Sequence, residues 1–113
     1  MGRIQQEPIY MSQWIDVAAL ADVFEGAGFA VEPEGLEIAL FSVDGEVFAT
    51  NNQCTHGLAM LCDGTVEGPY VQCPFHQGQF DVRTGACMGG PVTEPVKSWP
   101  VKVEAVRVWL DLG

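Results

Sequence analysis

The sequence has few basic residues, only two histidines and no long apolar run. Five Lys and Arg stand against fifteen Asp and Glu, so the formal net charge is −10. Such a chain lacks the clustered cations that binding to nucleic acid requires, which excludes nucleic acid as an expected partner. No apolar stretch is long enough to cross a bilayer, and the first residues lack the apolar segment of a secretory signal. We therefore expect a cytoplasmic protein without membrane contact, whose acidic surface favours solubility and a partner with a basic patch.

The length of 113 residues is that of one domain. We expect residues 1–10 to be a polar N-terminal tail and residues 11–113 to form the single domain. Thirteen glycines, seven prolines and many β-branched residues, with no long helical stripe, predict short strands joined by tight turns. The predicted fold class is all-β, an antiparallel β-sandwich or barrel.

Two hairpins are predicted, together with earlier strands at residues 14–17 and 29–31. In the first hairpin, Asp44-Gly45 separates apolar strands at residues 36–43 and 46–50, as in a type I′ turn. The second closes the chain, with its turn near Glu104-Ala105. Its predicted buried face consists of Val101, Val103, Val106, Val108 and Leu110.

Residues 51–91 break this alternation because glycine and proline recur throughout them. The pattern predicts loops around a few short strands, such as residues 70–72 and 79–82. A loop-rich subdomain of this kind buries little core of its own and needs an additional constraint.

Both histidines lie in this subdomain, each shortly after a cysteine, as Cys54-Thr55-His56 and Cys73-Pro74-Phe75-His76. Four interpretations are open: structural zinc, a Cys/His nucleophile, unrelated core residues, or a [2Fe–2S] cluster. Zinc fingers usually pair Cys with Cys and His with His ahead of a helix, whereas the order here alternates and no helix is predicted. A nucleophile would not need the arrangement twice. A cluster with two thiolates and two imidazoles uses all four residues.

These motifs resemble the two cluster-binding loops of Rieske proteins. From about residue 14 to residue 112 the chain is similar to the Rieske ferredoxins of bacterial aromatic-ring-hydroxylating dioxygenase systems, the naphthalene dioxygenase type especially. Further resembling stretches are Phe80-Asp81-Val82-Arg83-Thr84-Gly85, Pro91-Val92-Thr93 and Pro100-Val101-Lys102-Val103.

The resemblance implies a Rieske fold with a cluster-binding subdomain at about residues 51–91, and one [2Fe–2S] cluster per chain. Cys54 and Cys73 would ligate one iron, and His56 and His76 the other. The implied function is single-electron transfer from a flavin-dependent NAD(P)H reductase to a terminal aromatic-ring-hydroxylating oxygenase in aromatic hydrocarbon catabolism. The chain would then be a monomeric electron carrier, not an enzyme, with no catalytic residues.

Neutral imidazole ligands raise the potential of a cluster above that of one with four thiolates. Respiratory Rieske proteins also carry a disulfide between the two loops and hydroxyl donors to the cluster. Here Ala59 and Phe75 stand at the disulfide positions, and Gln79 and Phe80 at those of the hydroxyls. We therefore predict a potential at the low end of the Rieske range, about −150 mV.

The remaining residues of the subdomain suggest a covered, apolar site. Met88-Gly89-Gly90-Pro91 is interpreted as the loop that covers the cluster. Cys62 and Cys87 are expected to be small packed side chains, a redox pair being the alternative. An apolar mouth with Asp63 and Glu67 at its rim would exclude water and dock partners. The mouth residues are Leu58, Ala59, Met60, Pro74, Phe75 and Pro91.

Two alternative functions remain open at this point. One is the Rieske-like small subunit of an assimilatory nitrite reductase, and the other is an interaction module stapled by zinc. A Rieske oxygenase subunit is not expected, because residues 77–113, which follow the second motif, contain no histidine.

Overall fold

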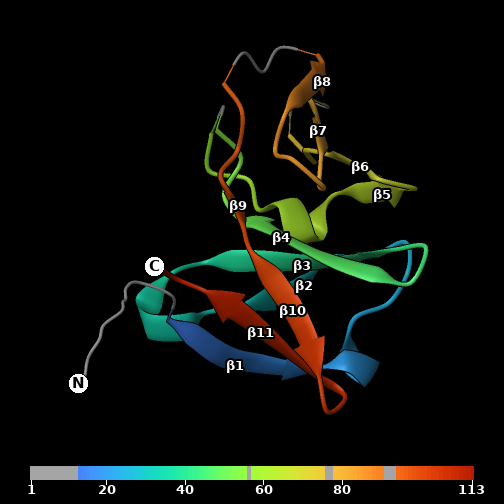
Figure 1. The fold of residues 1–113 in the computed structure, drawn as a ribbon. Coiled ribbons are helices and arrows are strands. Elements are labelled where there is room, and N and C mark those ends of the chain that lie inside the picture. The colour runs from blue at the N-terminus through green and yellow to red at the C-terminus, as the bar shows by residue number, and fades with distance from the viewer. Residues whose placement is uncertain (1–12, 56, 76–77, 91–93) are drawn as a thin grey trace.

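The computed structural model describes residues 13–55, 57–75, 78–90 and 94–113, whose strands form three antiparallel sheets (Figure 1). The sheets have the strand orders β1-β11-β10, β2-β3-β4-β9 and β5-β6-β7-β8. The predicted tail of residues 1–10, both histidines and Pro91 lie outside the described residues.

The described elements are short, as the turn-rich sequence predicts. The strands are β1 (Trp14–Ala19), β2 (Phe29–Val31), β3 (Ile38–Val43), β4 (Glu46–Asn51), β5 (Thr65–Glu67), β6 (Tyr70–Gln72), β7 (Gln79–Asp81), β8 (Cys87–Gly89), β9 (Ser98–Trp99), β10 (Val101–Glu104) and β11 (Arg107–Asp111). The 3-10 turns are η1 (Leu20–Asp22), η2 (Pro33–Gly35) and η3 (Leu61–Asp63). No helix in the described part of the chain has the length and apolar character to span a membrane.

The hairpin of β3 and β4 has the predicted type I′ turn. Asp44 and Gly45 have φ values of 52° and 86°, and Val43 pairs with Glu46 across the turn. Positive φ at both central residues matches the twist of the two strands, and Asp-Gly tolerates it at low cost. This local prediction is confirmed.

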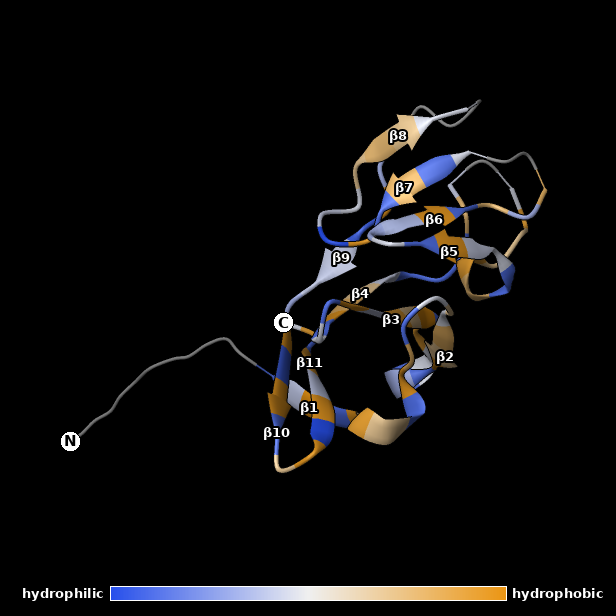
Figure 2. Cartoon of the chain, turned by 90° about the vertical axis from the view of Figure 1, so that its right-hand side faces the viewer, coloured by the Kyte–Doolittle hydropathy of each residue, from blue (hydrophilic) through white to orange (hydrophobic). Residues whose placement is uncertain are grey.

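Strand β3 is buried on both faces and separates two cores. Ile38 and Leu40 pack in the core between the β1-β11-β10 and β2-β3-β4-β9 sheets. Ala39 and Phe41 point the other way, into the core beneath β5–β8. Figure 2 shows this arrangement, with β5–β8 above β3 and β4, and with β1, β10 and β11 below them. Two-sided burial explains the unbroken apolar run of β3, and each large side chain contributes about 1.5–3 kcal/mol.

The C-terminal hairpin differs from the prediction. Val108 and Leu110 are fully buried as expected, but Val103 and Val106 are 43% and 73% exposed. The turn lies at Ala105-Val106, one residue later than predicted, because Glu104 pairs with Arg107. Val106 therefore belongs to the turn, and Val103 lies on β10, an edge strand of its sheet.

This turn is strained, since Ala105 and Val106 have φ values of 54° and 55°. The left-handed conformation costs an L-residue about 1–2 kcal/mol, and a β-branched side chain fits it poorly. We expect Val106→Gly to raise the free energy of unfolding by about 0.5–1 kcal/mol in urea denaturation. Val103→Gly, a similar change inside a strand, should lower it by a comparable amount. A loss of stability in Val106→Gly would contradict the strained turn.

Candidate metal centre

Two loops of matching geometry present the predicted cysteines. The Cys54 N–H donates to the Ala59 carbonyl at 2.9 Å, and the Cys73 N–H donates to the Gly78 carbonyl at 2.7 Å. Each loop thus closes from its cysteine to the fifth residue after it. The flanking residues also correspond: Gln53 bridges Met60, and Gln72 pairs with Gln79. We call residues 54–59 the first loop and residues 73–78 the second loop.

Both cysteines are buried in one core, whereas residues within the loops are exposed. Cys54 and Cys73 are 2% and 1% exposed and pack in a cluster that includes Phe80, which is fully buried. Leu58 and Phe75, from the first and second loops, are 81% and 68% exposed. Each loop therefore combines a sheltered sulfur with an exposed apolar side chain, as the predicted mouth requires.

The other mouth residues differ in exposure. Pro74 is exposed and Met60 is half-buried, but Ala59 is only 4% exposed and packs in the same core as Cys54. Ala59 is therefore part of the core, and the prediction that it lines the surface is wrong.

The chemistry and position of the described residues fit an iron–sulfur cluster. Two buried thiols that come from matching turns and pack in one core are the sulfur half of a ligand set with two thiolates and two imidazoles. His56 and His76, the predicted nitrogen half, follow those cysteines within the same loops but lie outside the described residues. The complete ligand set therefore remains a prediction.

A third segment is attached to the first loop by a hydrogen bond that sequence reasoning missed. The Thr55 hydroxyl donates to the Glu94 carbonyl at 2.9 Å. Two residues further on, the Val96 N–H donates to the Gly85 carbonyl at 2.9 Å, and Val96 is buried. The segment of residues 94–96 is thus held against the first loop and against the turn after β7. A hydroxyl between the two predicted ligands was the available sequence signal.

The predicted covering loop is partly a strand. Residues 87–89 form β8, which pairs with β7, and Met88 is 47% exposed. Cys62 and Cys87 are half-buried and pack against the same core as the predicted ligands. No disulfide joins Cys62 to Cys87, so the structure has them as thiols.

The turn after β7 is held by an ion pair between the buried Asp81 and the exposed Arg83. Arg83 donates to both carboxylate oxygens of Asp81, at 3.0 and 2.9 Å, and its N–H donates to Asp81 Oδ1 at 2.9 Å. These hydrogen bonds hold the pKa of the largely buried Asp81 below its ordinary value, against the opposing effect of burial. The ion pair fixes the start of this turn, and the Gly85 carbonyl at its end accepts the Val96 N–H.

Arg83 is the only Lys or Arg between residues 53 and 90, and Asp81 engages it. The exposed Asp63 and Glu67 have no ion pair with a described Lys or Arg. Asp63 lines a small pocket with Cys73 and Pro74, so it lies beside the second loop as predicted. Glu67 pairs with Tyr70 at the other end of the β5–β6 hairpin, so its predicted place at the rim is not confirmed.

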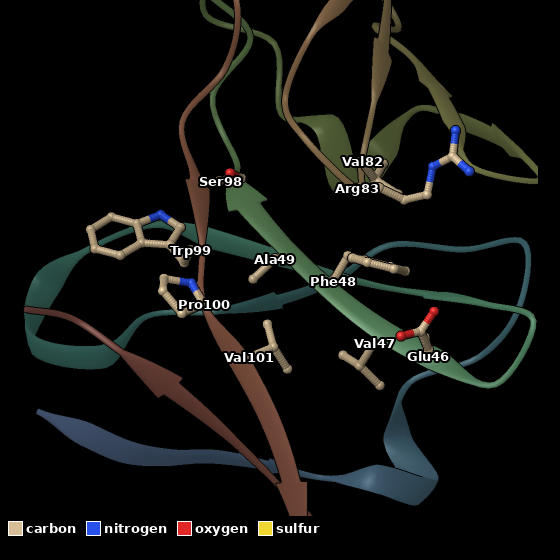
Figure 3. Close-up of a pocket in the computed structure, with 10 residues that line it drawn as sticks. All are labelled: Glu46, Val47, Phe48, Ala49, Val82, Arg83, Ser98, Trp99, Pro100 and Val101. Carbon is tan, nitrogen blue, oxygen red and sulfur yellow. The ribbon is translucent and has the colours of Figure 1, made fainter. Parts of the chain in front are cut away.

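A groove of about 420 Å³ lies away from the two loops (Figure 3). It opens where the pairing of β4 with β9 stops, and Val47 and Val101 lie between β4 and β10. No cysteine or histidine is among the residues that line it. The groove lies between neighbouring sheets and is not part of the candidate metal centre.

Comparison with known proteins decides the family. Residues 13–100 match the model of the Rieske [2Fe-2S] domain. The chain belongs to the Rieske family. The ferredoxin component of the naphthalene 1,2-dioxygenase system of Pseudomonas putida is 50% identical over 101 residues, which cover 89% of this chain and 97% of that protein.

Solved Rieske structures confirm the fold. A ferredoxin of Sphingomonas yanoikuyae B1 is 41% identical with a TM-score of 0.85, covering 89% of this chain and 100% of that one. A chain from a complex of reduced oxygenase and oxidised ferredoxin in carbazole 1,9a-dioxygenase is 35% identical with a TM-score of 0.81, covering 87% and 92%. The all-β Rieske architecture is thus confirmed.

Family membership also establishes the cofactor and the class of function. A Rieske domain of this kind takes one [2Fe–2S] cluster. The relatives are ferredoxins, so the chain is an electron carrier and not an enzyme.

Proposed function

We propose that Cys54, His56, Cys73 and His76 hold the cluster, with the two thiolates on one iron and the two imidazoles on the other. The observation that carries the proposal is the pair of matching loops, each closed from its cysteine N–H to a carbonyl five residues on. When bound, a cluster with these ligands accepts and releases one electron at a time. The surrounding residues determine how well water is excluded and where a partner approaches.

The burial pattern supports a division of roles between these residues. Phe80 and Leu61 are completely buried and pack in the same core as the two cysteines. They therefore keep water away from the sulfur atoms. Leu58 and Phe75 extend the apolar character of the site to the surface. A partner that covers both side chains therefore approaches the histidine-bearing parts of the loops.

We also propose that the protein carries electrons from a flavoprotein reductase to the terminal oxygenase of an aromatic-ring-hydroxylating dioxygenase system, as a cytoplasmic monomer. The names of its relatives support the oxygenase system, and the carbazole dioxygenase complex shows a similar ferredoxin together with an oxygenase. The 50% identity to dioxygenase ferredoxins favours this role over the nitrite reductase subunit. Asp63 beside the second loop, together with the net charge of −10, suits a basic docking surface on either partner.

Electron transfer to a terminal oxygenase of the naphthalene dioxygenase type tests the docking surface. In stopped-flow mixing of the pre-reduced protein with oxidised oxygenase, Phe75→Ser should lower the second-order rate constant roughly tenfold, because an exposed aromatic anchor is lost from a small interface. The potential should change little. The rate for the unsubstituted protein should also fall as salt is added.

Phe24→Ser is the matched control, because Phe24 is 64% exposed but lies in the link before β2. That variant should transfer electrons at the unsubstituted rate. Equal losses in both variants would show that docking does not depend on the surface around the two loops.

A further inference from the structure

The first and second loops have the same closure but unequal support. The second loop is carried by a regular ladder, in which Tyr70, Val71 and Gln72 of β6 pair with Asp81, Phe80 and Gln79 of β7. The first loop is flanked by a single bridge, between Gln53 and Met60. Because β4 ends at Asn51 and η3 begins at Leu61, no second strand continues beneath this loop. Some other group must hold its two ends together.

Asn52 supplies the first part of that support through its backbone. Its N–H donates to the Glu37 carbonyl at 2.9 Å, and its carbonyl accepts from the Leu61 N–H at 2.6 Å. The bond to Leu61 corresponds to the pairing of Val71 with Phe80 below the second loop. Asn52 thus joins the first loop to β3 through residue 37.

The next rung shows the difference. Below the second loop it is the pair Tyr70 and Asp81, and its counterpart here would be Asn51 and Cys62. Asn51 is engaged elsewhere: its N–H donates to the Lys97 carbonyl and its side chain accepts from the Trp99 indole. The Asn51 N–H is therefore bonded to the residue before β9, and Asn51 does not pair with η3.

The Asn52 side chain takes the place of the absent rung. Asn52 Oδ1 accepts from the Cys62 N–H at 2.9 Å, and Nδ2 donates to Cys62 Sγ at 3.3 Å. The residue is only 5% exposed, so breaking these bonds would leave buried polar groups without partners. A side-chain amide is well suited to this position, because it offers an acceptor and a donor, as a peptide group does.

We propose that Asn52 is the positioning residue of the first loop, and that its side chain sets where Cys54 and the rest of that loop stand relative to the second loop. This inference rests on the proposed role of the first loop as a ligand loop. The acceptor Oδ1 carries the effect, because the group that it holds is a backbone N–H. The sulfur of Cys62 contributes a weaker bond and can be replaced.

Hydrogen exchange on the cluster-loaded protein tests the proposal, with the second loop as internal reference. Asn52→Ala should speed the exchange of the amides of residues 54, 61 and 62 roughly tenfold or more, and leave those of residues 73 and 79 unchanged. The Rieske-type electron paramagnetic resonance signal should broaden, because the first loop then samples several positions. Asn52→Asp keeps the acceptor and should restore slow exchange and the narrow signal. Cys62→Ala should stay within about twofold of the unsubstituted protein.

Thr50→Val is the matched control. Thr50 is fully buried on β4, two residues before Asn52, and its hydroxyl donates to the Asn51 carbonyl and not to the first loop. This variant should raise exchange in both loops equally or in neither. If Asn52→Ala behaves like Thr50→Val, or if Cys62→Ala has the larger effect, the positioning role is wrong. If Asn52→Ala loads no cluster, failure of Asn52→Asp to recover loading would overturn the role. Absence of a Rieske-type signal in the unsubstituted protein would instead refute the proposed ligand set.

Discussion

The His76→Ala protein is expected to be purified without its cluster and without colour. In the proposed ligand set, removal of this imidazole leaves one iron with a single protein ligand, and a small alanine provides no replacement. The second loop would still be closed by the bond from Cys73 to Gly78, so the fold itself should survive. Iron and sulfide content, with visible absorption, measures the loss directly. We expect cluster loading below about one tenth of that of the unsubstituted protein, in line with the strong contribution of each ligand to a metal site.

Two further variants define the meaning of that result. Gln79→Ala changes a polar residue on β7, three positions later, and should keep the cluster. His76→Cys supplies a thiolate and should lower the potential of any cluster that assembles, because it adds negative charge. A stable, fully loaded cluster in His76→Ala would remove His76 from the ligand set.

The second large effect is expected at Gly85, in the turn after β7. Gly85 has a φ of 85°, and a Cβ added there would collide with the carbonyl oxygen of Val96. That carbonyl is part of a backbone that cannot withdraw easily, because the Val96 N–H is bonded to Gly85 itself. We expect Gly85→Ala to lower the free energy of unfolding by roughly 3 kcal/mol or more, and Tm by about 10 °C or more.

Gly45→Ala separates the two causes of that loss. Gly45 has nearly the same φ, 86°, but nothing lies within 4 Å of the position that its Cβ would take. Only the conformational cost remains, so this variant should lose about 1 kcal/mol. Urea denaturation of both variants measures the difference. Equal losses would mean that segment 94–96 does not press on the turn.

Local sequence signals predicted the elements that local chemistry determines. Asp44-Gly45 identified a hairpin because only a few residue pairs tolerate positive φ twice in succession. Cys54 and Cys73 could be singled out because a cysteine followed closely by a histidine, twice in one chain, has few structural explanations. The resemblance to Rieske ferredoxins then covered nearly the whole chain, and the comparisons confirmed it.

Long-range contacts were the part that the sequence could not supply. Strands β5, β8 and β9 are two or three residues long, too short for an alternation of apolar and polar residues to appear. Val106 fitted the alternation of its strand, but the register of the hairpin places it in the turn. The roles of Asn52 and Thr55 depend on partners that are 10 and 39 residues away. Such partners become visible only when the chain is folded.

The most direct test of the account is an anaerobic redox titration of the unsubstituted protein, followed by electron paramagnetic resonance. We expect a Rieske-type signal that appears on uptake of one electron per chain at about −150 mV. That result would establish two thiolates and two imidazoles as ligands and a carrier poised for an oxygenase system. A colourless protein that contains zinc and gives no signal would contradict the account, because Cys54, His56, Cys73 and His76 would then form a structural site without electron transfer.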